Sequence, residues 1–122
     1  MPEIAVETMR KMHRRGIRVL PGGDYGFAWT PHGTNAKDYE YFVDMIGMSP
    51  METLVAVTKH GGAIMGRPTE LGLLKPGYLA DMILVDGDPT RNIADIRHVW
   101  RTIKAGQVYD PAALEEAMGM SK

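Results

Sequence analysis

The chain has 122 residues, with 14 Lys and Arg against 15 Asp and Glu, a formal net charge of -1 and no cysteine. The charge balance excludes the basic surface that nucleic-acid binding requires, and the lack of cysteine excludes disulfides, thiol nucleophiles and thiolate metal sites. No apolar run approaches the roughly 20 residues of a membrane span, so we expect neither a nucleic-acid nor a membrane partner.

The N-terminal part of the chain predicts a helix, a short strand and a loop. Residues 3–15 place apolar residues among charges at helical spacing, and Gly16 ends that pattern. The apolar run 17–20 predicts a short strand, and residues 21–36, rich in Pro, Gly, Thr and Asn, predict a loop. A lone strand cannot satisfy its backbone hydrogen bonds, so its neighbours lie either in a later β segment or in residues that this chain lacks.

Two further helices are predicted after the loop. Residues 37–47 carry apolar side chains at the spacing of one helix face. Ser49 and Glu52 have the spacing of a capping box, and Pro50 suits the first helical position. The second helix therefore begins after Ser49 and runs to the Gly61-Gly62 pair, with a further turn possible beyond it.

From residue 71 onwards the composition predicts short strands rather than helices. Within residues 71–110, a Lys-Pro-Gly turn precedes the apolar run 82–85, which an Asp-Gly-Asp-Pro turn closes. The pair Ala105-Gly106 predicts a hairpin turn between two of these strands. Residues 111–119 predict a final helix that begins near Pro111.

Asp24 is the first candidate for a chemical role. It follows the predicted strand 17–20, and catalytic groups of barrel enzymes lie at the carboxyl ends of the strands. Gly22 and Gly23 allow a sharp turn and the close approach of a ligand. An aspartate in such a turn needs no function, however, and the stretch taken alone favours that simpler interpretation.

The remaining residues do not complete an active site of a recognised class. His32 is the only histidine in the loop of Asp24, and the sequence alone favours a loop histidine without a ligand role. A hydrolytic metal needs about three protein ligands and an open position, whereas Asp24 and His32 supply at most two. The motifs of serine hydrolases, P-loop proteins and dinucleotide-binding folds are absent.

Three segments carry a resemblance to a known family. They are GIRVLPGGDYGF, PHGTNAKDYEYFVDMIGMSPMETLVAVTKHGGAIMG and ELGLLKPGYLADMILVDGDP. In this order they resemble the C-terminal part of amidohydrolase-superfamily enzymes of the imidazolonepropionase-like and Xaa-Pro dipeptidase-like branch. The third segment is the most specific, because it joins L-G-x-L-K-x-G-x-x-A-D to an apolar strand and a D-G-D-P turn.

The resemblance implies an α/β fold, the C-terminal portion of a (β/α)8 TIM-like barrel plus strands of a small β-sandwich domain. Residues 1–70 would end the barrel with its eighth strand and flanking helices, residues 71–110 would form the sandwich strands, and residues 111–122 a C-terminal helix and tail. A full barrel takes roughly 250 residues. We therefore expect a fragment that begins at an internal Met1 and is inactive without the missing N-terminal barrel segment.

The resemblance also implies a metal-dependent hydrolase of amide bonds. Asp24 matches the aspartate that ends the eighth strand, ligates the catalytic metal and takes a proton from the attacking water. His32 and Asn35 would flank the substrate. The expected cofactor is Zn²⁺, with one or two divalent metals in a complete, homo-oligomeric enzyme. The expected substrate is a small peptide or N-acyl amino acid, and its identity and the cell compartment stay open.

A second interpretation is a self-contained, non-catalytic α/β module that binds a partner or forms oligomers. A chain of this length can bury a modest core by itself. Asp24 would then be a turn residue. Metal affinity at Asp24 and an exposed edge on strand 17–20 distinguish the hydrolase from this alternative.

Overall fold

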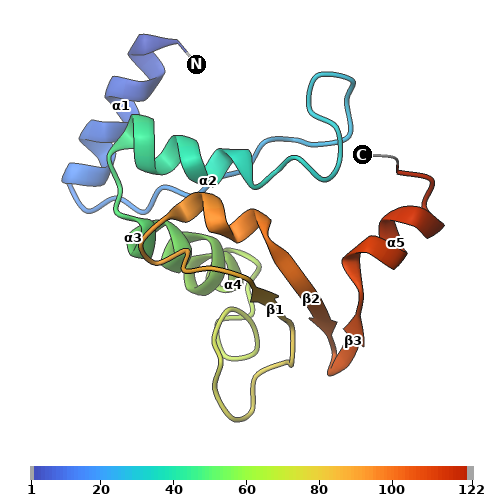
Figure 1. Cartoon of the computed structure of the whole chain (residues 1–122). Helices are drawn as coiled ribbons and strands as arrows, with labels where there is room; N and C mark the ends of the chain where they lie inside the picture. The colour runs from blue at the N-terminus through green and yellow to red at the C-terminus, as the bar shows by residue number, and fades with distance from the viewer. Residues whose placement is uncertain (1, 121–122) are drawn as a thin grey trace.

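A computed structural model describes residues 2–120, which form a group of helices followed by a small sheet (Figure 1). Met1 and the last two residues of the predicted C-terminal tail, 121–122, lie outside the described residues. The helical elements come first, and the strands follow with one short helix among them and one after them. In chain order these elements are α1 (Glu3–Arg14), α2 (Lys37–Tyr41), η1 (Phe42–Ile46), α3 (Pro50–Val55), η2 (Ala56–His60), α4 (Gly61–Ile64), β1 (Met82–Val85), η3 (Ile93–Arg97), β2 (Val99–Lys104), β3 (Gln107–Tyr109) and α5 (Pro111–Ala117).

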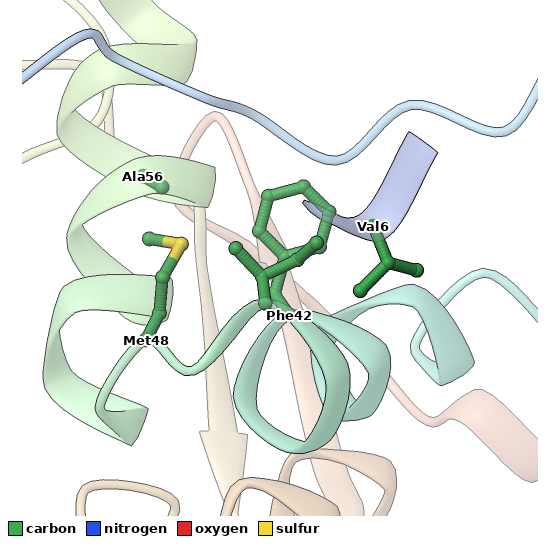
Figure 2. Close-up of a cluster of buried hydrophobic side chains, with 5 residues drawn as sticks. Val6, Phe42, Met48 and Ala56 are labelled. Carbon is green, nitrogen blue, oxygen red and sulfur yellow. The ribbon is translucent and has the colours of Figure 1, made fainter. Parts of the chain in front are cut away.

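The core lies where α1, η1 and the helix that begins at Pro50 meet. Figure 2 shows the side chains of Val6, Phe42, Met48 and Ala56 converging there from separate elements, and the buried Ile46 belongs to the same cluster. Burying large apolar side chains of this kind contributes about 1.5–3 kcal/mol each. This cluster therefore ties the N-terminal helix to the helices on the far side of the loop.

One polar contact adds to this packing between α1 and η1. The Arg10 guanidinium donates a hydrogen bond from Nε to the backbone carbonyl oxygen of Met45, at 2.6 Å. Carbonyls of the last helical turn have no partner within their own helix, so the cation satisfies one of them. Gly47 then ends the helix with φ 87°, which confirms the predicted helix over 37–47 and its end.

The predicted capping box at the start of α3 is present. The backbone N–H of Glu52 donates to Ser49 Oγ at 3.1 Å, and the Ser49 N–H donates to Glu52 Oε2 at 2.8 Å. The hydrogen bond from the Ser49 backbone, followed by that from its side chain, lowers the pKa of the Glu52 carboxyl. The helix continues without a break through α4, so the further turn beyond Gly61-Gly62 is confirmed.

The three strands form one antiparallel sheet in the order β1-β2-β3. Ala105 and Gly106 have φ values of 50° and 79°, the two positive values that a two-residue hairpin turn of type I′ requires. The Asp81 carboxylate accepts hydrogen bonds from Lys104 Nζ at 2.7 Å and from the Ala105 N–H at 2.8 Å. The predicted hairpin at Ala105-Gly106 is therefore confirmed, and a side chain from before β1 holds it.

Two predictions of secondary structure differ from the structure. Residues 17–20 do not form the predicted strand. Among the described residues, strand pairing joins only β1, β2 and β3 to one another, so residues 17–20 have no partner strand. Val19 nevertheless packs against the core. Residues 93–97 form the 3-10 helix η3 inside the region predicted as strands, because Ile93 and Ile96 bury one side of a single turn.

Within residues 2–120, no helix combines the length and apolar character that a membrane crossing needs.

Candidate active site

The loop between α1 and α2 extends beyond the helices, drawn in light blue in Figure 1. Asp24 lies in it with φ 48°, a left-handed conformation that aspartate and asparagine tolerate better than most residues. The loop then folds back on itself. The Gly26 N–H donates to the Thr30 carbonyl at 2.8 Å, and the Thr30 N–H donates to the Phe27 carbonyl at 3.1 Å. Asp24 therefore lies just before a hydrogen-bonded turn, residues 26–30, and not at the end of a strand.

The Asp24 side chain is exposed and has no hydrogen bond or ion pair with any other residue of the range 2–120. Its backbone, in contrast, is held, because the Thr30 hydroxyl donates to the Asp24 carbonyl at 3.3 Å. A carboxylate oxygen is an accepted ligand of zinc and of harder divalent cations. Asp24 thus has the chemistry of one metal ligand, with both oxygens open to receive it.

Tyr25 holds the other side of the same turn. Its ring folds back over Gly23, where an added Cβ would lie 2.3 Å from Tyr25 Cε2 and 2.9 Å from Asp38 Oδ2. Partial burial, followed by the hydrogen bond that the Tyr25 hydroxyl donates to Asp38, raises the pKa of Tyr25 to about 12. Tyr25 therefore links the turn of Asp24 to the start of α2.

Asp38→Asn is expected to lower the pKa of Tyr25 from about 12 towards its ordinary value of 10, because it removes a negative charge and a charged acceptor. A shift only part of the way is expected, because burial remains. In the native protein Tyr25 keeps its proton between pH 10 and 12 while the unfolded chain loses it. The stability that Tyr25 contributes is therefore complete below pH 10 and lost as the pH rises through 12.

An ultraviolet difference titration between the native protein and Tyr25→Phe isolates the Tyr25 hydroxyl. Asp44→Asn is the matched control, since Asp44 is an exposed carboxylate of the neighbouring helix η1. An unchanged Tyr25 titration in Asp38→Asn would show that the pair does not exist.

The two residues predicted to flank a substrate occupy different places on this loop. The His32 ring lies against Gly26, where an added Cβ would be 3.1 Å from Nε2. Asn35 lies at the loop's end, next to Tyr39 of α2. Burial, followed by the nearby Asp38 charge, raises the pKa of Tyr39, and a hydrogen bond with Asn35 offsets part of that rise. The loop thus brings His32 back towards the turn of Asp24, whereas Asn35 faces α2.

Asn35 also borders a cavity of about 980 Å³ between the loop's end, β2 and α5. Asp24 and His32 are not among the described residues that line this cavity. A smaller cavity of about 390 Å³ lies between the end of α1, residues 16–19 and α3. Neither of these two cavities is lined by all three predicted site residues.

The described residues contain no cluster of three or more His, Asp or Glu side chains placed to hold a metal ion. Asp24 by itself fits a metal as one carboxylate ligand and does not form a complete site with its neighbours. A hydrolytic metal centre takes about three protein ligands. Two further ligands would therefore have to come from outside the described residues.

Sequence reasoning missed the contacts that fix Asp24. Tyr25 and Asp38 pair across the loop, and Thr30 returns to the Asp24 carbonyl. No periodicity links these residues, because the loop between them has no regular repeat. The one available signal was the density of glycines around Asp24, which indicates close backbone approaches.

Comparison with known proteins identifies the family of this chain. The family model described as "Amidohydrolase family" matches residues 3–109. An imidazolonepropionase of Rubrobacter xylanophilus is 35% identical over 69 residues, which cover 54% of this chain and 17% of that protein. An ochratoxinase of Aspergillus niger is 28% identical over 95 residues, which cover 72% of this chain and 19% of that protein.

A solved structure, a Xaa-Pro dipeptidase with bound methionine in the active site, superimposes with a TM-score of 0.79 at 32% identity. The match covers 86% of this chain and 25% of that one. The chain thus spans about a fifth of the length of the curated relatives it matches, and about a quarter of this structure. Because the family model matches nearly the whole sequence, this chain belongs to the amidohydrolase family of hydrolases.

Proposed function

We propose that the chain forms part of a metal-dependent amidohydrolase, which uses water to cleave the amide bond of a small peptide or N-acyl amino acid. The observation that carries this proposal is the Asp24 carboxylate, exposed and without a partner among residues 2–120, on a turn that Thr30 and Tyr25 hold in place. The family match and the likeness to a Xaa-Pro dipeptidase support the reaction class.

The share of the relatives that this chain covers indicates which parts of the active site lie outside it. The relatives are between about five and six times as long as the matched segment, and the described residues hold no group of three side chains placed to bind a metal ion. We expect the remaining ligands on residues that precede this chain's part of a (β/α)8 barrel. Residues 17–20 would then be its eighth strand, which gains ladder partners only when the other strands lie beside it.

The chain's own residues have defined tasks in this reaction. A bound zinc ion would lower the pKa of a water molecule and polarise the amide carbonyl. The Asp24 carboxylate helps to hold the ion, accepts the proton that the attacking water loses, and passes that proton to the nitrogen of the leaving amine. His32 and Asn35 offer polar groups to the substrate. Thr30 and Tyr25 keep the backbone of Asp24 from moving as the proton changes place.

Removal of metal tests this function. The purified protein, with every polypeptide that copurifies, is expected to hydrolyse an N-acetyl amino acid and to lose at least about a hundredfold of that rate after dialysis against a chelator, because a metal supplies several kcal/mol of transition-state stabilisation. Added Zn²⁺ should restore the rate. Hydrolysis that is unaffected by the chelator would contradict metal dependence, and a metal-replete protein without hydrolysis of any amide would contradict the reaction class.

A further inference from the structure

Two aromatic side chains lie exposed on the loop that carries Asp24. The rings of Phe27 and Trp29 stack with their centroids 5.2 Å apart and their planes within 5°. Phe27 is 48% exposed and Trp29 is 79% exposed. A stacked pair has one ring face covered by the partner and the outer face open, so Trp29 presents an uncovered aromatic surface. Large exposed aromatic groups on a held loop are typical of binding surfaces.

The loop's hydrogen bonds place this pair next to Asp24 in space as well as in sequence. Thr30 follows Trp29 directly, and its hydroxyl reaches back to the Asp24 carbonyl. The bond from the Gly26 N–H to the Thr30 carbonyl closes the same turn, with Phe27 and Trp29 inside it. The stacked pair and Asp24 therefore belong to one short, hydrogen-bonded turn of the loop, residues 24–30.

The stretch of sequence that carries the pair favours an uncharged ligand group. Residues 25–35 contain no Asp, Glu, Lys or Arg. An aromatic face binds flat or apolar groups by stacking and by removal of apolar surface from water. Residues 25–35 offer no Asp, Glu, Lys or Arg that could form an ion pair with a charged ligand group bound at the two rings.

We propose that Phe27 and Trp29 form the specificity surface of the hydrolase, which receives an aromatic or other apolar side chain next to the scissile amide. This inference rests on the proposed function and names the substrate class: N-acyl amino acids or dipeptides with a large uncharged side chain. Trp29 contacts that side chain with its open face. Phe27 backs the indole and fixes its orientation, which lowers the entropy cost of binding.

The kinetic test compares N-acetyl-L-phenylalanine with N-acetylglycine in the complete protein, because the two share the scissile amide and differ in the side chain. Trp29→Ala is expected to lower kcat/KM for the phenylalanine substrate about 10- to 100-fold, and for the glycine substrate less than about threefold. Trp29→Phe should recover most of the loss. The matched control is Trp100→Ala, which removes the exposed tryptophan of β2. An equal loss on both substrates, or no loss on either, would overturn the proposal.

A binding measurement separates this inference from the proposed function, since it needs no turnover. L-phenylalanine is titrated against glycine while the tryptophan fluorescence of the native protein is compared with that of Trp29→Phe. A saturable change with phenylalanine only, absent in Trp29→Phe, supports the aromatic surface even if no amide is hydrolysed. No response to phenylalanine, or a Trp29 emission typical of a buried indole in the ligand-free protein, would mean that protein rather than ligand covers the pair.

Discussion

Asp24→Asn is expected to lower kcat for amide hydrolysis about 10²- to 10⁴-fold, the range that a positioned proton acceptor contributes. An amide keeps the shape of the carboxylate but has no negative charge and accepts protons poorly, so it loses both proposed tasks at once. Asparagine also tolerates the left-handed backbone of this position, φ 48°, as well as aspartate does. The substitution therefore tests chemistry without straining the turn.

The fold is expected to survive this substitution. The Asp24 side chain is exposed and makes no hydrogen bond or ion pair within the described range, so the free energy of unfolding should change by less than about 0.5 kcal/mol. Asp44→Asn is the matched control, because Asp44 is also exposed and lies on η1, away from the loop. Steady-state kinetics and urea unfolding of both variants check the prediction. Near-normal turnover in Asp24→Asn would remove Asp24 from the mechanism.

Gly62→Ala is expected to destabilise the protein by about 1–3 kcal/mol, the usual cost of overpacking. A Cβ on Gly62 would lie 2.3 Å from the Leu71 carbonyl oxygen and 2.8 Å from its carbonyl carbon. That backbone has little room to withdraw, since Gly72 approaches Thr58 just as closely: its Cβ would lie 2.2 Å from the Thr58 carbonyl oxygen. The two glycines are what allow the chain after α4 to lie against the preceding helix.

Gly61→Ala provides the control for Gly62→Ala, because the two glycines are neighbours in one helix. A Cβ on Gly61 would meet only the Ala56 carbonyl oxygen, at an ordinary 3.9 Å. Alanine is the better helix former, so Gly61→Ala should be neutral or stabilising by up to about 1 kcal/mol. Thermal or urea unfolding compares the two variants. Equal stability of both would show that the approach of Leu71 is looser than the structure indicates.

The features that the sequence predicted well are those with local causes. The Ser49–Glu52 capping box lies within four consecutive residues, and the Ala105-Gly106 turn requires only its own two dihedrals. Gly47 likewise ends a helix by its own left-handed conformation. Each of these follows from the residues themselves, whatever the rest of the chain does.

The features that the sequence did not predict depend on distant partners. The apolar run 17–20 has the composition of a strand, but a strand forms only beside another strand, and none lies there within residues 2–120. The 3-10 turn η3 exists because Ile93 and Ile96 find a place to bury. The pairing of Tyr25 with Asp38 depends on the path of the whole loop.

The candidate site divides in the same way. The glycines around Asp24 indicated a special turn, and the resemblance to the amidohydrolases implied the role of its carboxylate. The stacking of Phe27 on Trp29 and the return of Thr30 to the Asp24 carbonyl could not be read from the sequence, because they arise from the folded loop. These contacts connect Asp24, the candidate metal ligand, to Phe27 and Trp29, the candidate binding surface.

The central claim, that Asp24 is a metal ligand of a working hydrolase, is tested most directly by the metal content of the purified protein. Mass spectrometry would identify every polypeptide in the sample and, in parallel, the metal bound to native protein and to Asp24→Asn. We predict one or two divalent metal ions, with zinc the expected element, and a clearly weaker retention in Asp24→Asn during dialysis. Equal retention in both proteins, or a metal-free sample that hydrolyses amides, would contradict the claim.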